Sequence, residues 1–130
     1  MQNQPPPGLP SQIIPTEPGQ YSPSNDERTM GMVIHLLLIL TGFLGPLILW
    51  LVKKDESGFI NHHGKEAINY LITHFIVSLV LIALSIVTLG LGALLFFPYG
   101  IALLILEIIA CISAYQGKWY RYPLTIRLIK

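Results

Sequence analysis

The sequence predicts an all-α membrane protein: a three-transmembrane-helix bundle, preceded by a disordered proline-rich tail and followed by a short interfacial segment. Hydrophobic residues make up 52% of the 130 residues and charged residues make up 12%, about half the share that is usual in soluble domains. The charges are also clustered, since none lies between Met30 and Val52 and only Glu107 lies between Ala67 and Gln116. This composition excludes an ordinary soluble enzyme.

Residues 1–29 differ in composition from the rest of the chain. Seven of the ten prolines lie between Pro5 and Pro23, among Gln, Ser, Asn and Gly residues, and the few apolar residues show no period. Such a segment buries too little apolar surface to offset the entropy that is lost on ordering. We therefore expect residues 1–29 to be a disordered tail with polyproline character, and residues 30–130 to form the membrane domain.

Three apolar runs follow the tail, at residues 30–52, 67–89 and 94–115. Each is long enough, as a helix, to reach about 30 Å, the thickness of the hydrocarbon layer. A helix satisfies its own backbone hydrogen bonds within lipid, whereas a lone strand does not. With their polar ends included, the predicted helices cover residues 30–52, 62–89 and 94–116, and residues 117–130 form the interfacial tail.

Local signals place the ends of these helices. Asn61 is a suitable N-cap for the second helix, and Gly90 is suited to end that helix on the far side. Pro98 is tolerated in the first turn of the third helix, where its missing N–H has little effect. Pro46, by contrast, lies within the first run, just after Gly45, and predicts a kink there. A packing kink is the simpler interpretation of this stretch, and a gate or hinge is the alternative.

The positions of Lys and Arg predict the orientation in the membrane. In a three-span bundle, the loop between the first two spans and the C-terminal tail share a side, and together they hold Lys53, Lys54, Lys65, Lys118, Arg121, Arg127 and Lys130. The opposite side holds only Arg28. By the positive-inside rule, the N-terminus is then expected outside and the C-terminus in the cytoplasm. The aromatic and basic C-terminal tail is expected to lie along the cytoplasmic interface.

Two ionisable side chains, His74 and Glu107, lie inside the predicted second and third spans. At about 1.5 Å per residue, both are roughly 11 to 12 Å from the cytoplasmic ends of their helices, whereas His35 falls near the outer surface. Glu107 shares its helix face with Ala110 and Ala114, a spacing that lets helices approach closely. We therefore expect His74 and Glu107 to form a buried polar pair. A hydrogen bond between spans is the simpler role, and a proton or cation relay is the alternative.

The sequence contains no pattern that is typical of catalysis or of a metal site. His62 and His63, with Asp55 and Glu56 nearby, suggest a divalent metal, but adjacent histidines on a helix point about 100° apart. Cys111 is alone and flanked by apolar residues, so we expect it to be inert. A net charge of +1 provides no basic surface for a nucleic acid. We expect no enzyme activity, no metal and no cofactor.

Two segments of the chain resemble a known protein family. The sequence HGKEAIN at His63–Asn69 follows the stretch Gly45–Ser57, and YRYPLTIR at Tyr120–Arg127 lies near the C-terminus. Together they are similar to a family of small bacterial membrane proteins of unknown function, itself distantly similar to the twenty-kilodalton membrane component of the chloroplast inner-envelope protein-import translocon. The resemblance covers residues 30–130. It implies a multi-pass protein of the bacterial plasma membrane and supplies no catalytic or substrate-binding residues.

The positions that carry this resemblance gather at the cytoplasmic interface of the predicted bundle. They form a candidate cluster that consists of His63, Lys65, Glu66, Asn69, Arg121 and Arg127. We expect the loop between the first two spans to pack against the C-terminal tail, with Glu66 available to Arg121 or Arg127.

The predicted function is that of a non-enzymatic membrane protein that acts through association in the lipid bilayer, as a homo-oligomer or an accessory subunit of another membrane protein. The alternative is a small transporter or translocation-pore subunit with a polar path through His74 and Glu107. Three helices are too few to enclose an aqueous path, so this alternative requires oligomers. A factor that shields the membrane under stress is a third interpretation, without a residue signature in the sequence.

Overall fold

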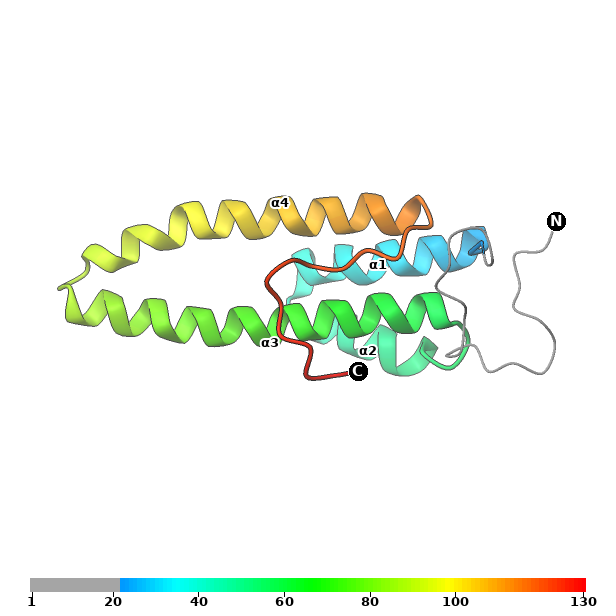
Figure 1. Ribbon diagram of the computed structural model, residues 1–130, viewed down its shortest axis with the longest axis horizontal. Helices are drawn as coiled ribbons and strands as arrows, with labels where there is room; N and C mark the ends of the chain where they lie inside the picture. The colour runs from blue at the N-terminus through cyan, green and yellow to red at the C-terminus, as the bar shows by residue number, and fades with distance from the viewer. Residues whose placement is uncertain (1–21) are drawn as a thin grey trace.

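The computed structural model describes residues 22–130, and this part of the chain is all-helical, without a strand. Its elements are α1 (Asn25–Thr41), α2 (Leu44–Lys53), α3 (Gly58–Val87), the short 3₁₀ helix η1 (Leu91–Leu95) and α4 (Phe96–Tyr115). Helices α3 and α4 form a long antiparallel hairpin, and α1 and α2 form a shorter hairpin against one half of it (Figure 1). The predicted disorder of residues 1–21 lies outside the described residues, whereas residues 25–29 are helical.

The first apolar run forms two helices, so the prediction of a single kinked span over residues 30–52 is wrong. Helix α1 ends at Gly42, whose φ of 68° is a left-handed conformation that glycine adopts without strain. The Thr41 hydroxyl accepts the N–H of Gly45 at 3.0 Å. Pro46 then falls in the first turn of α2, where a backbone N–H has no partner within the helix. The chain reverses at this point, and α2 runs back beside α1 (Figure 1).

Two helical stretches remain that are long and apolar enough to cross a membrane, namely α3 with 30 residues and Leu91–Tyr115 with 25 residues. Most of their large apolar side chains are exposed. Beyond Thr73 no residue of α3 is buried, and in α4 only Ala110 and Ala114 are buried. Such a surface is suited to lipid, so that two candidate spans replace the three predicted from the sequence.

The start of α1, the start of α3 and the end of α4 meet at one end of the molecule, which we call the base. Glu27, near the start of α1, accepts a hydrogen bond from the Ser57 hydroxyl that precedes α3. Arg28 lies against Gly117, which follows α4. Because α2 runs back beside α1, the start of α1 and the end of α4 lie at the same end of the molecule (Figure 1). The three-span arrangement places them on opposite sides, and the predicted orientation in the membrane stays a prediction.

Small residues let the helices of the base approach one another closely. Ala110 and Ala114 of α4 are fully buried, and Gly31 of α1 lies against Ala114. The small face predicted for the third helix therefore serves contacts within the chain. Trp50 of α2 packs onto Gly64 of α3, where a Cβ atom would lie 2.1 Å from the indole ring. Any side chain at position 64 would force α2 away from α3.

Helix α3 begins earlier than predicted because Ser57, rather than Asn61, is its N-cap. The Ser57 hydroxyl accepts the N–H groups of Phe59 and Ile60 at 3.1 and 3.3 Å. The Asn61 side chain instead accepts the indole N–H of Trp50 at 2.8 Å. Asn61 thus fixes the position of α2 against α3.

At the end opposite the base, a tight turn joins α3 to η1 and α4. Leu89 and Gly90 have φ values of 56° and 98°, and the Gly90 N–H donates to the Ser85 carbonyl at 2.7 Å. This left-handed pair ends α3 near Gly90, as predicted. Pro98 lies in the first turn of α4, also as predicted.

Candidate functional site

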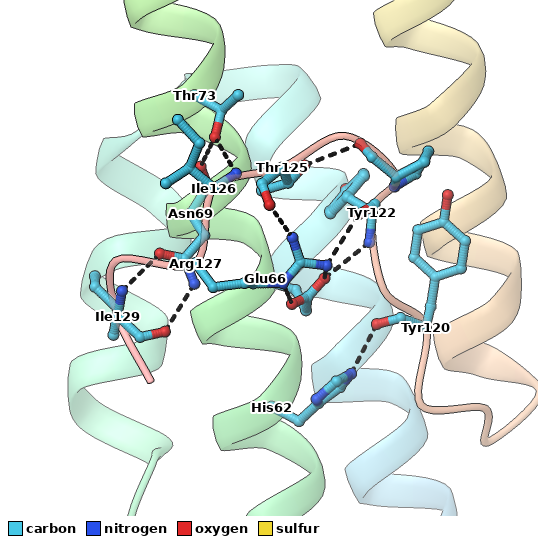
Figure 2. Close-up of polar contacts among 11 residues, drawn as sticks. His62, Glu66, Asn69, Thr73, Tyr120, Tyr122, Thr125, Ile126, Arg127 and Ile129 are labelled. Atoms are coloured by element: carbon cyan, nitrogen blue, oxygen red, sulfur yellow. Dashed lines mark hydrogen bonds and ion pairs between the residues drawn. The ribbon is translucent and has the colours of Figure 1, made fainter.

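Residues 117–130, which we call the strap, leave the end of α4 in an extended conformation and run back over the bundle (Figure 1). The strap turns at Pro123 and Leu124, the latter with a φ of 53°. It then crosses α3 (Figure 2). The strap is therefore part of the folded base, and its predicted position along the membrane interface stays a prediction.

A stripe of polar side chains on α3 receives the strap. Its members follow a helical spacing of four, three and four residues, which places them on one face of the helix: His62, Glu66, Asn69 and Thr73. Figure 2 shows that all four point toward the strap. We call them the polar stripe.

Asn69 and Thr73 bind the backbone of the part of the strap that crosses α3. Asn69 accepts the N–H of Ile129 and donates to the carbonyl of the same residue, both at 2.8 Å. The Thr73 hydroxyl accepts the N–H of Ile126 at 2.9 Å. It donates its own proton to the Asn69 carbonyl at 2.9 Å. The side chains of α3 thus replace the partners that a neighbouring strand would supply.

Glu66 lies at the centre of the polar stripe and forms an ion pair with Arg127. Its Oε1 lies 2.8 Å from Arg127 Nε as an ion-pair contact, and its Oε2 accepts a hydrogen bond from Nη2 at 3.0 Å. The same Oε2 accepts the N–H of Tyr122 at 2.8 Å. Arg127 also donates to the carbonyls of Tyr122, at 2.9 Å, and Thr125. The expected contact of Glu66 with Arg121 or Arg127 is therefore confirmed for Arg127.

These bonds satisfy the non-helical backbone of the strap. Backbone N–H and C=O groups that are buried need hydrogen-bond partners, and an extended segment without a neighbouring strand finds them in side chains. The polar stripe accepts the strap N–H groups of Tyr122, Ile126 and Ile129. The segment HGKEAIN thus lies on α3, the helix that binds the strap, and YRYPLTIR lies in the strap itself.

Tyr122 anchors the strap in the core of the base. Its side chain is 1% exposed and belongs to a buried cluster with Leu38, Tyr70 and Ala110. The rings of Tyr122 and Tyr70 are stacked, with centroids 4.0 Å apart. One strap residue therefore connects α1, α3 and α4, which gives the strap a hydrophobic as well as a polar attachment.

A chain of hydrogen bonds runs from Tyr122 through two buried histidines to the strap backbone. The Lys118 carbonyl can only accept, so Nε2 of His63, at 3.0 Å, is the donor. In a neutral ring the Nδ1 of His63 then accepts from Nε2 of His35 at 2.9 Å. The Nδ1 of His35 in turn accepts the Tyr122 hydroxyl at 2.8 Å. One carbonyl thus fixes the tautomers of both rings.

Burial keeps His35 in its neutral form. The side chain is fully buried on α1, which is not one of the two spanning stretches. Burial, with a smaller contribution from His62, lowers the pKa of His35 from 6.5 to about 3. The bond that His35 accepts from Tyr122 requires an unprotonated Nδ1, so protonation would break the chain of hydrogen bonds.

The histidine chain predicts that the protein loses stability in acid. Between pH 6.5 and about 3, the unfolded state binds a proton at His35 and the native state does not, so stability falls as the pH falls. The expected loss is about 1.4 kcal/mol per pH unit in this window. Unfolding of the detergent-solubilised protein, followed at several pH values, measures it. His35→Gln should reduce the slope of unfolding free energy against pH by about 1.4 kcal/mol per pH unit, the contribution of one proton. Equal slopes for the two proteins would contradict this assignment.

The other members of the predicted cluster also contact the strap or lie beside it. His63 donates to the Lys118 carbonyl, and Lys65 donates to the Lys130 carbonyl at 2.7 Å. Arg121 is exposed on the strap and lines a cavity at the base. The structure thus brings together all six residues of the cluster around the strap.

His74 and Glu107 do not form the predicted pair. His74 Nδ1 is hydrogen-bonded to the Tyr99 hydroxyl, and its Nε2 has no partner within residues 22–130. The His74 ring also packs against Tyr70, with centroids 4.2 Å apart. The placement of His35 near the outer surface is wrong as well, because His35 is buried in the base. The polar path of the transporter alternative therefore lacks its central contact.

The two adjacent histidines are engaged with the strap rather than with a common ligand. His62 Nε2 lies 2.7 Å from the Tyr120 carbonyl and therefore donates to it (Figure 2). Both ring nitrogens of His63 are used in the histidine chain. The two side chains thus serve different contacts, in agreement with the divergence of neighbouring positions on a helix.

Four residues of this site were not identified from the sequence as strap contacts, namely His62, Thr73, Tyr122 and His35. Thr73 carries a signal in hindsight, since it continues the spacing of Glu66 and Asn69 by one further turn. Tyr122 and His35 carry none, because their hydrogen bond joins positions 87 residues apart.

Residues 26–129 match the magnetosome magnetite crystal formation protein family. The matched range contains α1 except its first residue, α2 to α4, the polar stripe and all but the last residue of the strap. No curated protein and no solved structure matches the chain. The similarity to the chloroplast import component therefore finds no support in these comparisons. Because the match extends over nearly the whole described part, this chain belongs to the magnetosome magnetite crystal formation protein family.

Proposed function

We propose that this protein is a non-enzymatic membrane component that acts through association, as a homo-oligomer or as an accessory subunit of another membrane protein. The description of the family concerns magnetite crystal formation in magnetosomes. Under this proposal, a contribution to such a process would come from the membrane and through neighbouring proteins. The bacterial plasma membrane is the proposed location.

The observation that carries this proposal is the distribution of apolar surface. In the half of the molecule away from the base, α3 and α4 have only each other and η1 as partners (Figure 1). Their outward side chains are large and apolar, and Phe75, Val80, Ile86, Phe97 and Ile105 are each more than half exposed. A surface of this kind requires lipid or other transmembrane helices around it.

The proposed orientation places the base on the cytoplasmic side of the membrane. All eight Lys and Arg residues of the chain lie in α1, at the junction of α2 with α3, in the second turn of α3 or in the strap: Arg28, Lys53, Lys54, Lys65, Lys118, Arg121, Arg127 and Lys130. The turn at the other end has none between Val87 and Leu91. The positive-inside rule then favours cytoplasmic positions for both the start of α1 and the strap.

Crosslinking in native membranes tests the proposal. A photoreactive residue at Ile86 or Phe97, which are 72% and 76% exposed, should give one defined product, either a dimer of differently tagged copies or one specific foreign protein. The same residue at Leu38, which is 4% exposed, should react only within the chain. Extraction of the protein by alkaline carbonate, or only lipid adducts at both outer positions, would overturn the proposal.

A further inference from the structure

A cavity of about 700 Å³ opens at the base, between the first turns of α3 and the strap. Its lining contains four cationic side chains and an aromatic ring: Lys65, Arg121, Arg127, Lys130 and Trp119. We propose that this cavity binds the phosphate of an anionic phospholipid headgroup. The proposal rests on the membrane location argued above and names a ligand for this end of the molecule.

The charge in the cavity is not balanced by the protein. Glu66 is the only carboxylate side chain of the lining, and it is already paired with Arg127. Lys65 donates to one carbonyl and, as an ammonium group, retains further N–H donors. Arg121 makes no hydrogen bond or ion pair within residues 22–130 and presents its whole guanidinium group. An ammonium and a planar guanidinium on facing segments match the oxygens of a phosphate.

The surface beside the cavity favours a lipid over a free anion. In the extended part of the strap, Ile126 and Leu128 alternate with Arg127 and Ile129, which line the cavity. Ile126 and Leu128 are 50% and 61% exposed, and Leu124, in the turn before them, is 96% exposed. A headgroup in the cavity would therefore have an apolar row next to it for its acyl chains. The lining also contains Trp119, and tryptophan is enriched at membrane interfaces.

Lipid binding to the solubilised full-length protein tests this site without a surrounding bilayer. Native mass spectrometry, with titration of phosphatidylglycerol and phosphatidylcholine, gives the dissociation constant of each lipid. The wild-type protein should bind phosphatidylglycerol at least tenfold more tightly. The double variant Lys65→Gln/Arg121→Gln should lose about tenfold in this affinity, since hydrogen bonds to charged groups contribute on this scale. Arg121→Gln alone, at an exposed position, should lose part of it with an unchanged unfolding temperature.

A matched control removes the same charge from the same end of the molecule. Lys53→Gln/Lys54→Gln changes two cations that do not line the cavity, and phosphatidylglycerol affinity should change less than twofold. Equal losses in the two double variants would overturn the proposal, because a diffuse charge effect would then explain the binding. Displacement of the lipid by millimolar inorganic phosphate would also overturn it, since the site would then recognise a free anion. Because single solubilised copies are measured, a failure here is distinguishable from a failure to associate with neighbours in the membrane.

Discussion

Replacement of Glu66 by Gln is expected to lower the free energy of unfolding by about 3 kcal/mol and to release the strap. The side chain of Glu66 is 5% exposed and that of Arg127 is 22% exposed, so the variant leaves a largely buried guanidinium without its counter-charge. The charge-assisted bond to the Tyr122 N–H is weakened at the same time. Unfolding in detergent measures the loss, and trypsin cleavage after Arg121 or Arg127 reports the release of the strap.

The exposed ion pair between Lys53 and Glu56 provides a matched control. Its atoms are 3.3 Å apart and the Glu56 side chain is 59% exposed, so Glu56→Gln should change stability by less than about 1 kcal/mol. Equal effects of the two Glu→Gln changes would show that the Glu66 pair is no stronger than a surface pair.

An exchange of charges separates the two arginines that the sequence offered as partners of Glu66. Glu66→Arg combined with Arg127→Glu should recover part of the stability that either change removes. Recovery should be incomplete, because an arginine at position 66 cannot accept the Tyr122 N–H. Glu66→Arg combined with Arg121→Glu should give no recovery, and the reverse pattern would contradict the observed pairing.

Replacement of Tyr122 by Ala is expected to have an effect of similar size, about 3 to 5 kcal/mol. It removes an aromatic side chain from the buried cluster around Tyr70 and leaves a cavity. It also removes the hydroxyl donor to His35, which Tyr122→Phe removes alone at about 1 to 3 kcal/mol. Thermal unfolding of both variants, with trypsin cleavage of the strap, separates the packing contribution from the hydrogen bond.

Tyr115, at the end of α4, is the comparison for Tyr122. It is 58% exposed, so Tyr115→Ala should change stability by less than about 0.5 kcal/mol. If the two Tyr→Ala changes were equally destabilising, the strap would not be anchored by the ring of Tyr122.

The sequence predicts the two long helices well because length and apolarity alone identify them. The first run misleads because Gly42 and Pro46 are compatible with either a kink within a span or a turn between two helices. Contacts with distant residues distinguish the two arrangements: the fit of Trp50 onto Gly64, and the bond between Glu27 and Ser57. Neither contact has a local signature in the sequence.

The candidate site could be predicted in part for a related reason. Glu66 and Arg127 are charged and lie in two recognisable segments, so their pairing could be proposed. The other contacts of the polar stripe go to backbone atoms of the strap. Backbone groups are the same in nearly every residue, so the sequence does not show which of them will be bound. The proposed pairing of His74 with Glu107 rested on equal depth in three complete spans. Because α3 begins at Gly58, His74 lies 16 residues from the base end of its helix, whereas Glu107 lies only 8 residues from the end of α4 at Tyr115. The two side chains are therefore not level, and Tyr99 lies opposite His74 instead.

The short hairpin of α1 and α2 gives the molecule a different width at its two ends. Four helices and the strap fill the cross-section near the base, whereas only α3, η1 and α4 continue beyond it (Figure 1). If the base faces the cytoplasm, as proposed, and part of it lies within the inner leaflet, each copy displaces more lipid from that leaflet than from the outer one. Many copies side by side would therefore act as wedges that expand the cytoplasmic leaflet and make it the convex face of a curved membrane.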